Sequence, residues 1–434
     1  MRDYLIVAVI LASLPVGVIN PYYGILVYAW VSYMYPQMLG WSFAQTFPVA
    51  KLAALSTCAG TFLNRAADLT PLREREIIAM VLLWCTFTLS SVFAVYQTEA
   101  WRQWQDVSKL IVMSLLTSTL LTDQKKTRYF LLVVALSIGF YGIKGGIFSF
   151  RNGGDTMIWG PGTSVMGANN SIGLALNMCL PFLWYLSVEH RGPMKRLLQA
   201  GFFLSIPAIM FTYSRASALT LAGVLLALIM KGRNALILIF ILLIAAVIAG
   251  PLIPASFWAR QGTVLTYEQD ASAMSRIENW KFCWRLALDN PLVGAGFQFQ
   301  TRDMFAKYAP DFLERFGKEF NTHNIFLAIL TTHGFPALLL FLTMIGFVVL
   351  SCRKMRRSVR HREDLKWIVL YCDLVQVSLF AFLVNGMFVN MEYFDLPYHL
   401  VALTASMKVI HRRLLAEDAV EIPTAPQLAP AAAS

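Results

Sequence analysis

The chain has 434 residues, of which 57% are hydrophobic and only 14% are charged, and its formal net charge is +11 at pH 7. This amino-acid composition lies outside the range that is typical of globular proteins, and it excludes a separate water-soluble domain of useful size. Apolar runs recur from one end of the chain to the other. Since a helix needs about 20 mostly apolar residues to cross a membrane, we predict an all-α, polytopic integral membrane protein.

The predicted spans follow one another along most of the chain. In chain order they are residues 47–63, 76–97, 104–121, 128–148, 169–188, 196–213, 215–231, 234–253, 323–350, 367–388 and 395–410. Residues 4–36 are ambiguous. They form either two short helices hinged at Asn20 and Pro21, because proline breaks the hydrogen-bond ladder, or one span followed by an interfacial segment.

The short loops alternate in basicity. Lys and Arg gather in every second loop, at Arg65, Arg73 and Arg75, Lys125, Lys126 and Arg128, Arg191, Lys195 and Arg196, Lys231 and Arg233, Arg353 to Lys366, and Arg412 and Arg413. The positive-inside rule places these loops in the cytoplasm. The net charge therefore reflects orientation and contact with anionic headgroups, and we expect no nucleic acid partner. With 47–63 running inward, one net crossing in 4–36 gives about twelve spans and two cytoplasmic termini.

This topology divides the chain into four regions. Residues 1–253 form an N-terminal transmembrane bundle, and residues 254–322 form one long outer loop with amphipathic helices. Residues 323–413 form the C-terminal transmembrane helices. Residues 414–434 are rich in Ala and Pro, a composition that predicts a disordered cytoplasmic tail.

Lys144 is the first candidate for anion binding. It lies near the outer end of its predicted span within residues 142–146 (GIKGG), and Arg151 follows in a glycine-rich loop. Glycines permit close backbone approach to a ligand, and lysine supplies a point charge suited to phosphate. The alternative for Lys144 is a side chain that reaches lipid headgroups from the end of the span.

Arg215 follows Tyr213 and Ser214 at an outer turn between two predicted spans. Ser214 can cap the new helix, which leaves Arg215 in its first turn. Free N–H groups, the positive end of the helix dipole and a guanidinium then converge on one anion site. An arginine that reaches to headgroups is the alternative.

Arg276 stands in a similar local pattern. Residues 275–278 (SRIE) resemble a capping box, which predicts a helix that begins at Ser275 with Arg276 at its N-terminus. Its apolar face consists of Ile277, Trp280, Trp284 and Leu288, and Asn290 with Pro291 ends the helix. Such an amphipathic helix suits the membrane surface, whereas an ordinary solvated arginine is the alternative for Arg276.

His323 and Asn324 open a span directly after the long polar stretch. The helix dipole and interfacial burial favour a neutral imidazole there, as a general base requires. A histidine that only caps or packs is the alternative. We expect no metal site, because His333 lies about 15 Å deeper by helical rise and no compact ligand motif accompanies His323.

Several motifs together resemble the O-antigen ligase and polymerase superfamily. They are residues 212–216 (TYSRA), 275–280 (SRIENW) before 290–296 (NPLVGAG), and His323 and Asn324 followed after nine intervening residues by Gly334. The last pattern resembles the ligase branch, with Ala337 where that branch more often has Gly. Residues 140–148 (FYGIKGGIF), 167–170 (GANN) and 175–178 (ALNM) are similar to the O-glycosylation ligases proposed in exosortase-containing bacteria.

The resemblance implies an inverting glycosyltransferase that uses neither a metal nor a cofactor. It would transfer a glycan from undecaprenyl pyrophosphate to a hydroxyl of a lipid A-core acceptor, at the periplasmic face of the bacterial inner membrane. Arg215 and Arg276 would bind the pyrophosphate, and His323 would activate or orient the acceptor hydroxyl. Further expected site residues are Lys144 and Arg151 for the pyrophosphate, with Tyr213, Ser214, Asn170, Trp280 and Asn324 in support.

Three other functions stay open on the sequence. A polymerase, or a protein O-oligosaccharyltransferase, would use the same donor with a different acceptor surface, which residues 254–322 would provide. A small-solute transporter belongs to another class. Transporters place ionisable groups near the membrane midplane, whereas here the candidate cations gather outside and Asp373 is the clearest charge within a span.

Overall fold

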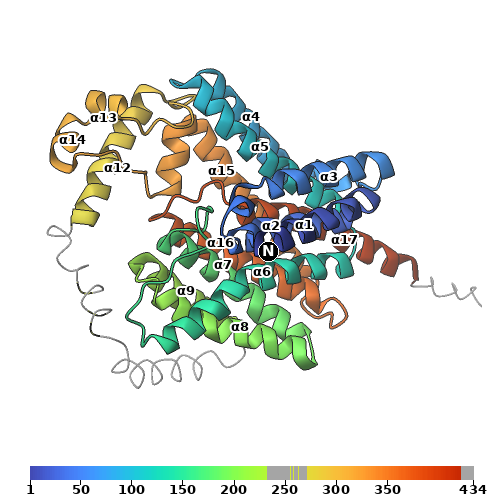
Figure 1. The fold of residues 1–434 in the computed structure, drawn as a ribbon. Helices are drawn as coiled ribbons and strands as arrows, with labels where there is room; N and C mark the ends of the chain where they lie inside the picture. The colour runs from blue at the N-terminus through green and yellow to red at the C-terminus, as the bar shows by residue number, and fades with distance from the viewer. Residues whose placement is uncertain (232–254, 256–257, 259–261, 263–270, 422–434) are drawn as a thin grey trace, which may run out of the picture.

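The computed structural model describes residues 1–231 and 271–421 together with positions 255, 258 and 262, so the predicted span 234–253 lies outside the described residues. Helices dominate this described part, and no strand occurs in it. The helices are α1 (Arg2–Ile19), α2 (Pro21–Met34), α3 (Val49–Asn64), α4 (Arg75–Val92), α5 (Gln97–Leu120), α6 (Gln124–Arg151), α7 (Asn169–Glu189), α8 (Gly192–Met210), α9 (Arg215–Met230), α12 (Ala271–Asp289), α13 (Arg302–Tyr308), α14 (Pro310–Phe316), α15 (Ile325–Ser358), α16 (Lys366–Gly386) and α17 (Asp395–Glu421) (Figure 1).

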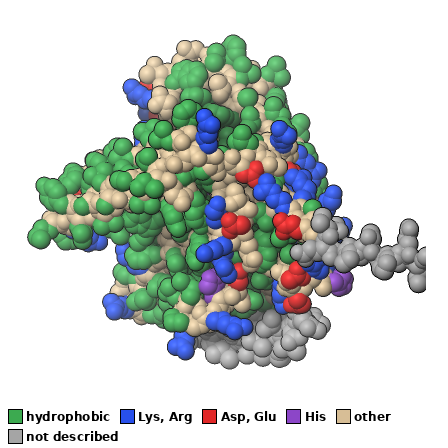
Figure 2. Space-filling view, turned by 90° about the vertical axis from the view of Figure 1, so that its right-hand side faces the viewer, with side chains coloured by type: hydrophobic (Ala, Val, Ile, Leu, Met, Phe, Trp, Pro, Cys, Tyr) green, Lys and Arg blue, Asp and Glu red, His purple; other side chains and the backbone are tan. Residues whose placement is uncertain are grey.

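The prediction of an all-α membrane protein is confirmed. Six of the described helices are long and apolar enough to cross a membrane, namely α1, α4, α6, α7, α15 and α16. The total of about twelve spans remains a prediction, because it rests on hydrophobic length and loop charge alone. Hydrophobic side chains cover much of the face in Figure 2, and Lys, Arg, Asp and Glu gather on one flank of it.

The predicted cytoplasmic loops lie together at one end of the bundle, which we call the basic end. Ion pairs connect them between helices, with Arg413 on Asp68 at 2.7 Å, Lys408 on Glu74 at 2.7 Å and Arg128 on Glu189 at 3.4 Å. We call the other end, where α15 begins and α16 ends, the far end. The alternation of loop charge therefore corresponds to a real division of the structure.

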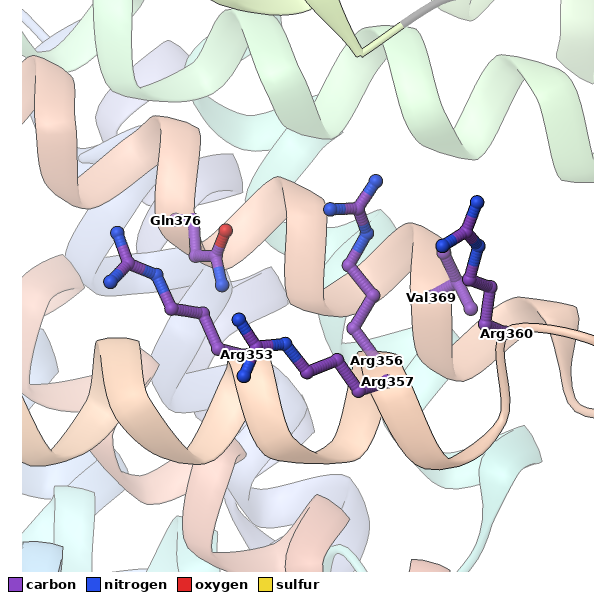
Figure 3. Close-up of a pocket in the computed structure, with 6 residues that line it drawn as sticks. All are labelled: Arg353, Arg356, Arg357, Arg360, Val369 and Gln376. Atoms are coloured by element: carbon purple, nitrogen blue, oxygen red, sulfur yellow. The ribbon is translucent and has the colours of Figure 1, made fainter.

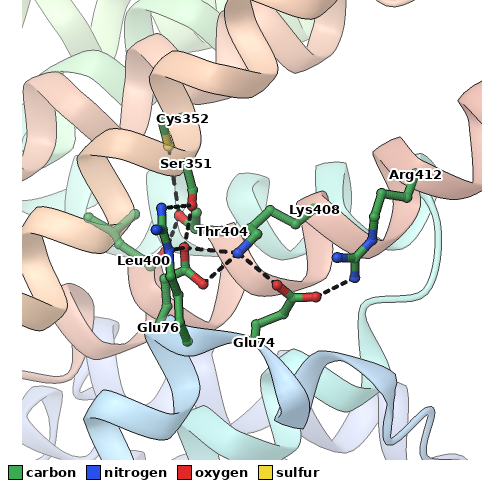
Figure 4. A network of polar contacts seen from close by, with 9 residues as sticks. Glu74, Glu76, Ser351, Cys352, Leu400, Thr404, Lys408 and Arg412 are labelled. Atoms are coloured by element: carbon green, nitrogen blue, oxygen red, sulfur yellow. Dashed lines mark hydrogen bonds and ion pairs between the residues drawn. The ribbon is translucent and has the colours of Figure 1, made fainter.

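A buried polar network ties three helices together at the basic end (Figure 4). Glu76 of α4 is fully buried, and its carboxylate accepts hydrogen bonds from Lys408 Nζ of α17, the shorter at 2.8 Å, and from Ser351 of α15. Lys408 also pairs with Glu74, which accepts a further bond from Arg412. A buried carboxylate is tolerated only with such partners, so this network fixes how α4, α15 and α17 meet.

The first two helices form an antiparallel hairpin. The Asn20 side chain caps α2 by accepting from a backbone N–H of its first turn at 3.1 Å, and Gly17 packs on Gly24 across the hinge. Asp3 accepts from the backbone N–H of Ser42 at 2.9 Å, so α1 begins beside the segment that follows α2. The alternative of two short helices hinged at Asn20 and Pro21 is therefore the one that the structure shows, while the number of crossings in 4–36 and the side of each terminus stay predictions. Proline at the first position of α2 starts a second helix rather than bending the first.

The long helix α15 is broken at Gly334, which has φ 82° and ψ 176°. Residues 290–296 lie against the break and supply the missing backbone partners. Ala295 and Gly296 donate to the carbonyls of Thr331 and Thr332 at 2.9 and 3.0 Å, and Phe335 N–H donates to the Pro291 carbonyl at 2.8 Å. Glycine is required because a side chain at Gly334 would meet the backbone of residue 292 at 2.6 Å.

Helices α12, α13 and α14 form a small lobe at the far end, at one corner of the molecule in Figure 1. Its core consists of aromatic rings, with Phe282 stacked on Phe305 at 4.1 Å between centroids. On the opposite side of α12, Trp284 and Leu288 remain about half exposed, at 47% and 54%. This apolar surface fits the prediction of an amphipathic helix.

Removing Lys408 should destabilise the bundle. Lys408→Ala removes the closer cation of the buried Glu76 carboxylate and leaves, among the described residues, only Arg75, whose Nε lies 3.6 Å away; breaking a buried ion pair typically costs roughly 3–5 kcal/mol. We expect a clear fall in the thermal unfolding temperature of the purified protein. The matched control is Lys366→Ala, which removes the exposed partner of Glu363 and should change the temperature little. Equal unfolding temperatures for both variants would contradict the assigned network.

Candidate functional site

The turn between α16 and α17 contacts three elements that carry candidate site residues. At its start, the Asn385 side chain donates to Ser217 Oγ in the first turn of α9 at 3.1 Å. The Phe388 ring lies 6.4 Å from the Trp280 ring of α12, and the Asn390 side chain accepts from the His323 backbone N–H. The turn therefore gathers the helix that begins at Arg215, the helix that carries Arg276, and His323 itself.

The prediction for Ser214 is confirmed, because it caps α9 by accepting from Ser217 N–H at 3.2 Å. Arg215 is the first residue of α9 and stands at the positive end of its dipole. The preceding turn is held in place by neighbours. Tyr213 adopts φ 54° and donates from its hydroxyl to the Gly154 carbonyl at 2.7 Å. The Asn169 side chain donates to the carbonyl of Thr212 at 2.8 Å.

Arg276 is not at a helix N-terminus. Helix α12 already extends over Ala271–Asp289, so Ser275 lies inside it and the predicted capping box is wrong. The pattern SRIE is local, and here the helix continues through it because apolar Phe282 and Leu286 bury one face in the lobe. The predicted end of the helix is confirmed, since α12 stops directly before Asn290.

Helix α12 positions the segment before His323. The Asn279 side chain donates to the Asn321 carbonyl at 2.7 Å, and the Trp280 indole donates to the Thr322 carbonyl at 2.9 Å. These bonds come from residues three and four after Arg276. The sequence between Arg276 and Trp280 thus serves to hold His323 beside the arginine.

His323 itself lies just before α15, in the left-handed conformation with φ 49°. Its Nδ1 is buried and has no hydrogen-bond partner among the described residues. Burial, together with the nearby charge of Arg276, lowers the pKa of His323 to about 4. Asn324 caps α15 by accepting from the N–H groups of Phe326 and Leu327 at 2.9 and 3.1 Å. The imidazole is therefore neutral at physiological pH, and the backbone of His323 is held by Asn390 and by the cap that follows it.

The glycines around Lys144 have a different role from the predicted one. A side chain at Gly142 would meet Ser205 Oγ of α8 at 2.0 Å, and one at Gly146 would meet the Leu204 carbonyl at 2.3 Å. The close backbone approach is therefore between two helices and not toward a ligand. Lys144 stands exposed on the flank of α6, about 10 Å along the axis from Arg151 by helical rise.

Arg151 differs from its predicted setting, and Asn170 has a local role at the start of α7. Arg151 is the last residue of α6 rather than part of a glycine-rich loop, and it is exposed. It lies near the Arg215 turn through Gly154, which accepts the hydrogen bond from Tyr213. Asn170 lies in the first turn of α7, where its side chain accepts from the adjacent N–H of Ser171.

Some residues of this region were missed from the sequence. A polar cavity of about 300 Å³ adjoins His323, and its wall includes Gln298, Gln300, Asn390 and Glu392. Each is a single polar residue near an apolar segment, and the spacing between the four residues matches no recognisable motif. His333 was considered only as a metal ligand, yet it is buried between Phe87 and Phe297, with ring centroids 4.2 and 4.7 Å away.

A second cavity, of about 590 Å³, lies at the basic end (Figure 3). Four arginines line it: Arg353, Arg356 and Arg357 from the last turns of α15, and Arg360 from the segment just after that helix. It is separated from His323 by the length of α15. Asp373, the charge noted within a span, lies beside it and pairs with Arg356 at 3.3 Å and with Lys231.

Comparison with known families divides the chain in two. Residues 1–186 match a family of unknown function, and residues 200–342 match the family described as O-Antigen ligase. No curated protein matches the chain. The second match contains Arg215, Arg276 and His323, as well as the broken part of α15 and the segment that pairs with it. Residues 200–342 of this multi-pass membrane protein thus match the O-antigen ligase family, and this match supports a place in the O-antigen ligase and polymerase superfamily.

Proposed function

We propose that the protein transfers a glycan from undecaprenyl pyrophosphate to a hydroxyl of a lipid A-core acceptor, at the periplasmic face of the bacterial inner membrane. The observation that carries this proposal is that the end of α16 and the turn after it contact the first turn of α9, helix α12 and the backbone of His323, which brings the elements that carry Arg215 and Arg276 to one region of the far end. The match of residues 200–342 to the O-antigen ligase family supports a glycosyltransferase in general. The donor, acceptor and orientation are our inference from the chemistry of these groups.

The reaction needs charge stabilisation above all. The acceptor oxygen forms a bond to the anomeric carbon while the bond from that carbon to the pyrophosphate oxygen breaks, and the pyrophosphate leaves with the electron pair. Two guanidinium groups and the N-terminus of α9 suit this growing negative charge. Attack from the face opposite the leaving group inverts the anomeric centre. In this mechanism the protein's own cations, without a metal, stabilise the leaving group.

The acceptor proton must also be removed. His323 is neutral, so it can accept that proton or orient the hydroxyl by a hydrogen bond. Its low pKa makes it a weak base, which means that orientation is a substantial part of its proposed role. Lys144 and Arg151 remain proposed pyrophosphate contacts, and their exposure leaves them accessible to a lipid-linked donor.

A polymerase or a protein O-oligosaccharyltransferase is the second candidate, because the same cations would serve the same donor. A transporter is less well supported. The one charge noted within a span, Asp373, is paired with Arg356 and Lys231 at the basic end and so has a structural explanation.

The first test concerns the arginines. Arg215→Ala and Arg276→Ala should each abolish transfer of lipid-linked glycan to lipid A-core, while the folded protein stays in the membrane. Lys at either position should restore activity only in part, since lysine lacks the bidentate fork. The assay is reconstitution of purified protein with donor and acceptor, followed by detection of a larger conjugate. Arg302→Ala, at an exposed position of the same lobe, is the control. Wild-type turnover in an alanine variant would remove that arginine from the site.

The second test separates the two roles of His323. If it is a general base, His323→Ala and His323→Gln should both lower turnover by roughly 10²- to 10⁴-fold. If it orients the acceptor, His323→Gln should keep most activity. The active form of the base is the neutral imidazole, so the base model also predicts an acid limb of the rate near pH 4 that is absent from the residual activity of the variants. Near-normal activity of the Gln variant would end the base assignment.

The third test concerns orientation. In a background without the six native cysteines, a cysteine at the exposed Gly262 should react with an impermeant thiol reagent from the periplasmic side. One at Ser358, the last residue of α15 at the basic end, should be protected until the membrane is permeabilised. The reverse pattern of labelling would place His323 on the cytoplasmic face and refute the proposed orientation.

A further inference from the structure

The polar cavity beside His323 is built mainly from amide side chains. It has a volume of about 300 Å³, and its polar wall consists of Gln103, Gln298, Gln300, Asn321, Asn390 and Glu392. Its apolar wall includes the rings of Phe297 and Tyr393. No Lys or Arg is among the described residues that line it. The cavity therefore does not suit a pyrophosphate, which needs cations.

Hydrogen bonds already hold parts of this wall in place. Gln298 adopts φ 61° and donates from its side chain to Gln103 Oε1 of α5 at 2.7 Å. Gln300 donates to Thr322 Oγ1 at 3.2 Å, directly before His323 in the chain. An amide that donates one bond to the protein keeps its carbonyl oxygen and a second N–H for a ligand. The wall is thus preorganised, with donors and acceptors left over.

Glu392 is the one acidic side chain in this wall. Its Oε2 is buried and has no hydrogen-bond partner among the described residues. The Tyr398 hydroxyl donates to the backbone carbonyl of Glu392 at 2.8 Å and fixes the loop that carries it. A buried carboxylate oxygen without a protein partner is costly, so a hydrogen-bond donor that enters the cavity is stabilised beside it.

The cavity connects directly to the segment around His323. Asn390 both lines the cavity and accepts from the His323 backbone N–H, and Asn321 lines it from two residues earlier. A molecule in the cavity would therefore lie close to the backbone of His323. The arginines approach the same segment from α12 and α9, so the cationic and the amide-lined regions are distinct.

We propose that this cavity is the acceptor subsite, that it binds an uncharged sugar ring, and that the Glu392 carboxylate accepts a hydrogen bond from one of the ring hydroxyls. Amides and a carboxylate match the mixed donors and acceptors of a sugar, and the two aromatic rings match its C–H faces. The volume is at the lower end of ligand pockets, which fits one sugar unit rather than a long chain. This assignment rests on the proposed transferase function, whose donor site it leaves unchanged.

The subsite should give the reaction a pH dependence of its own. Burial raises the pKa of Glu392 to about 7, so its ionised form is lost as the pH falls through neutrality. The titratable and charged groups around this part of the far end are Tyr393 and Tyr398 beside it, His333 behind Tyr393, and Asp106, Lys109 and Asp395 in the adjoining cavity. His323 titrates about three units lower, at about 4, which separates the two groups.

The test is acceptor kinetics with Glu392→Gln. We expect the acceptor KM to rise roughly 10- to 100-fold, as for loss of a hydrogen bond to a charged group, with an unchanged donor KM. The acid limb of kcat/KM near pH 7 should disappear in this variant. Glu314→Gln, at an exposed carboxylate of α14, should match the wild type in both respects. An unchanged acceptor KM, or a limb near pH 7 that persists, would overturn the assignment.

Two further measurements make the outcome specific. Asn321→Ala, at an exposed residue of the same wall, should also raise the acceptor KM, and it guards against misfolding of the Glu392 variant. Binding of core oligosaccharide without any donor, followed by isothermal calorimetry, should weaken in both variants. If wild-type protein binds the oligosaccharide but forms no conjugate, the proposed transfer fails and the subsite stands. If wild-type protein forms conjugate and both variants match it in acceptor KM and in oligosaccharide binding, the subsite assignment is wrong while the proposed transfer stands.

Discussion

The break in α15 is the constraint on which the far end depends. A helix interrupted within a membrane exposes backbone groups that lipid cannot satisfy, so some other segment must bond to them. Residues 290–296 do so at Gly334. This pairing fixes the end of α12 against the middle of α15, and α12 in turn fixes the segment that leads to His323. The position of His323 therefore follows from the hydrogen bonds that the broken helix α15 requires.

The far end keeps opposite chemistries apart. Cations come from α9 and α12, whereas amides and one carboxylate come from the turn after α16 and from residues 298–300. A transferase that joins an anionic donor to a neutral hydroxyl benefits from this separation, because a carboxylate close to the pyrophosphate would weaken its binding. His323 lies between the two regions, with Arg276 near its ring and Asn390 on its backbone.

Sequence patterns were informative where a local rule acts alone. The charge of the loops predicted which helix ends lie together, and Ser214 was identified as a cap because N-caps depend on neighbouring residues only. Sequence patterns gave wrong or missing predictions where tertiary packing determines the structure. Ser275 lies inside α12 because the lobe stabilises a longer helix, and Glu392 became a candidate only once the fold had placed its oxygen in a cavity. No spacing in the sequence joins residues 103, 298 and 392.

The glycine contact between α6 and α8 has a consequence for a site it does not touch. Gly146 lies directly on the Leu204 carbonyl, and α8 leads within a few residues to the turn that presents Arg215. The distance between the axes of α6 and α8 thus influences where the Arg215 guanidinium lies. A single methyl group at Gly146 would push against the Leu204 carbonyl of α8, and the resulting shift of α8 would move the turn that leads to Arg215. The glycine-rich motif around Lys144 would then act by setting the distance between α6 and α8, and through it the position of Arg215.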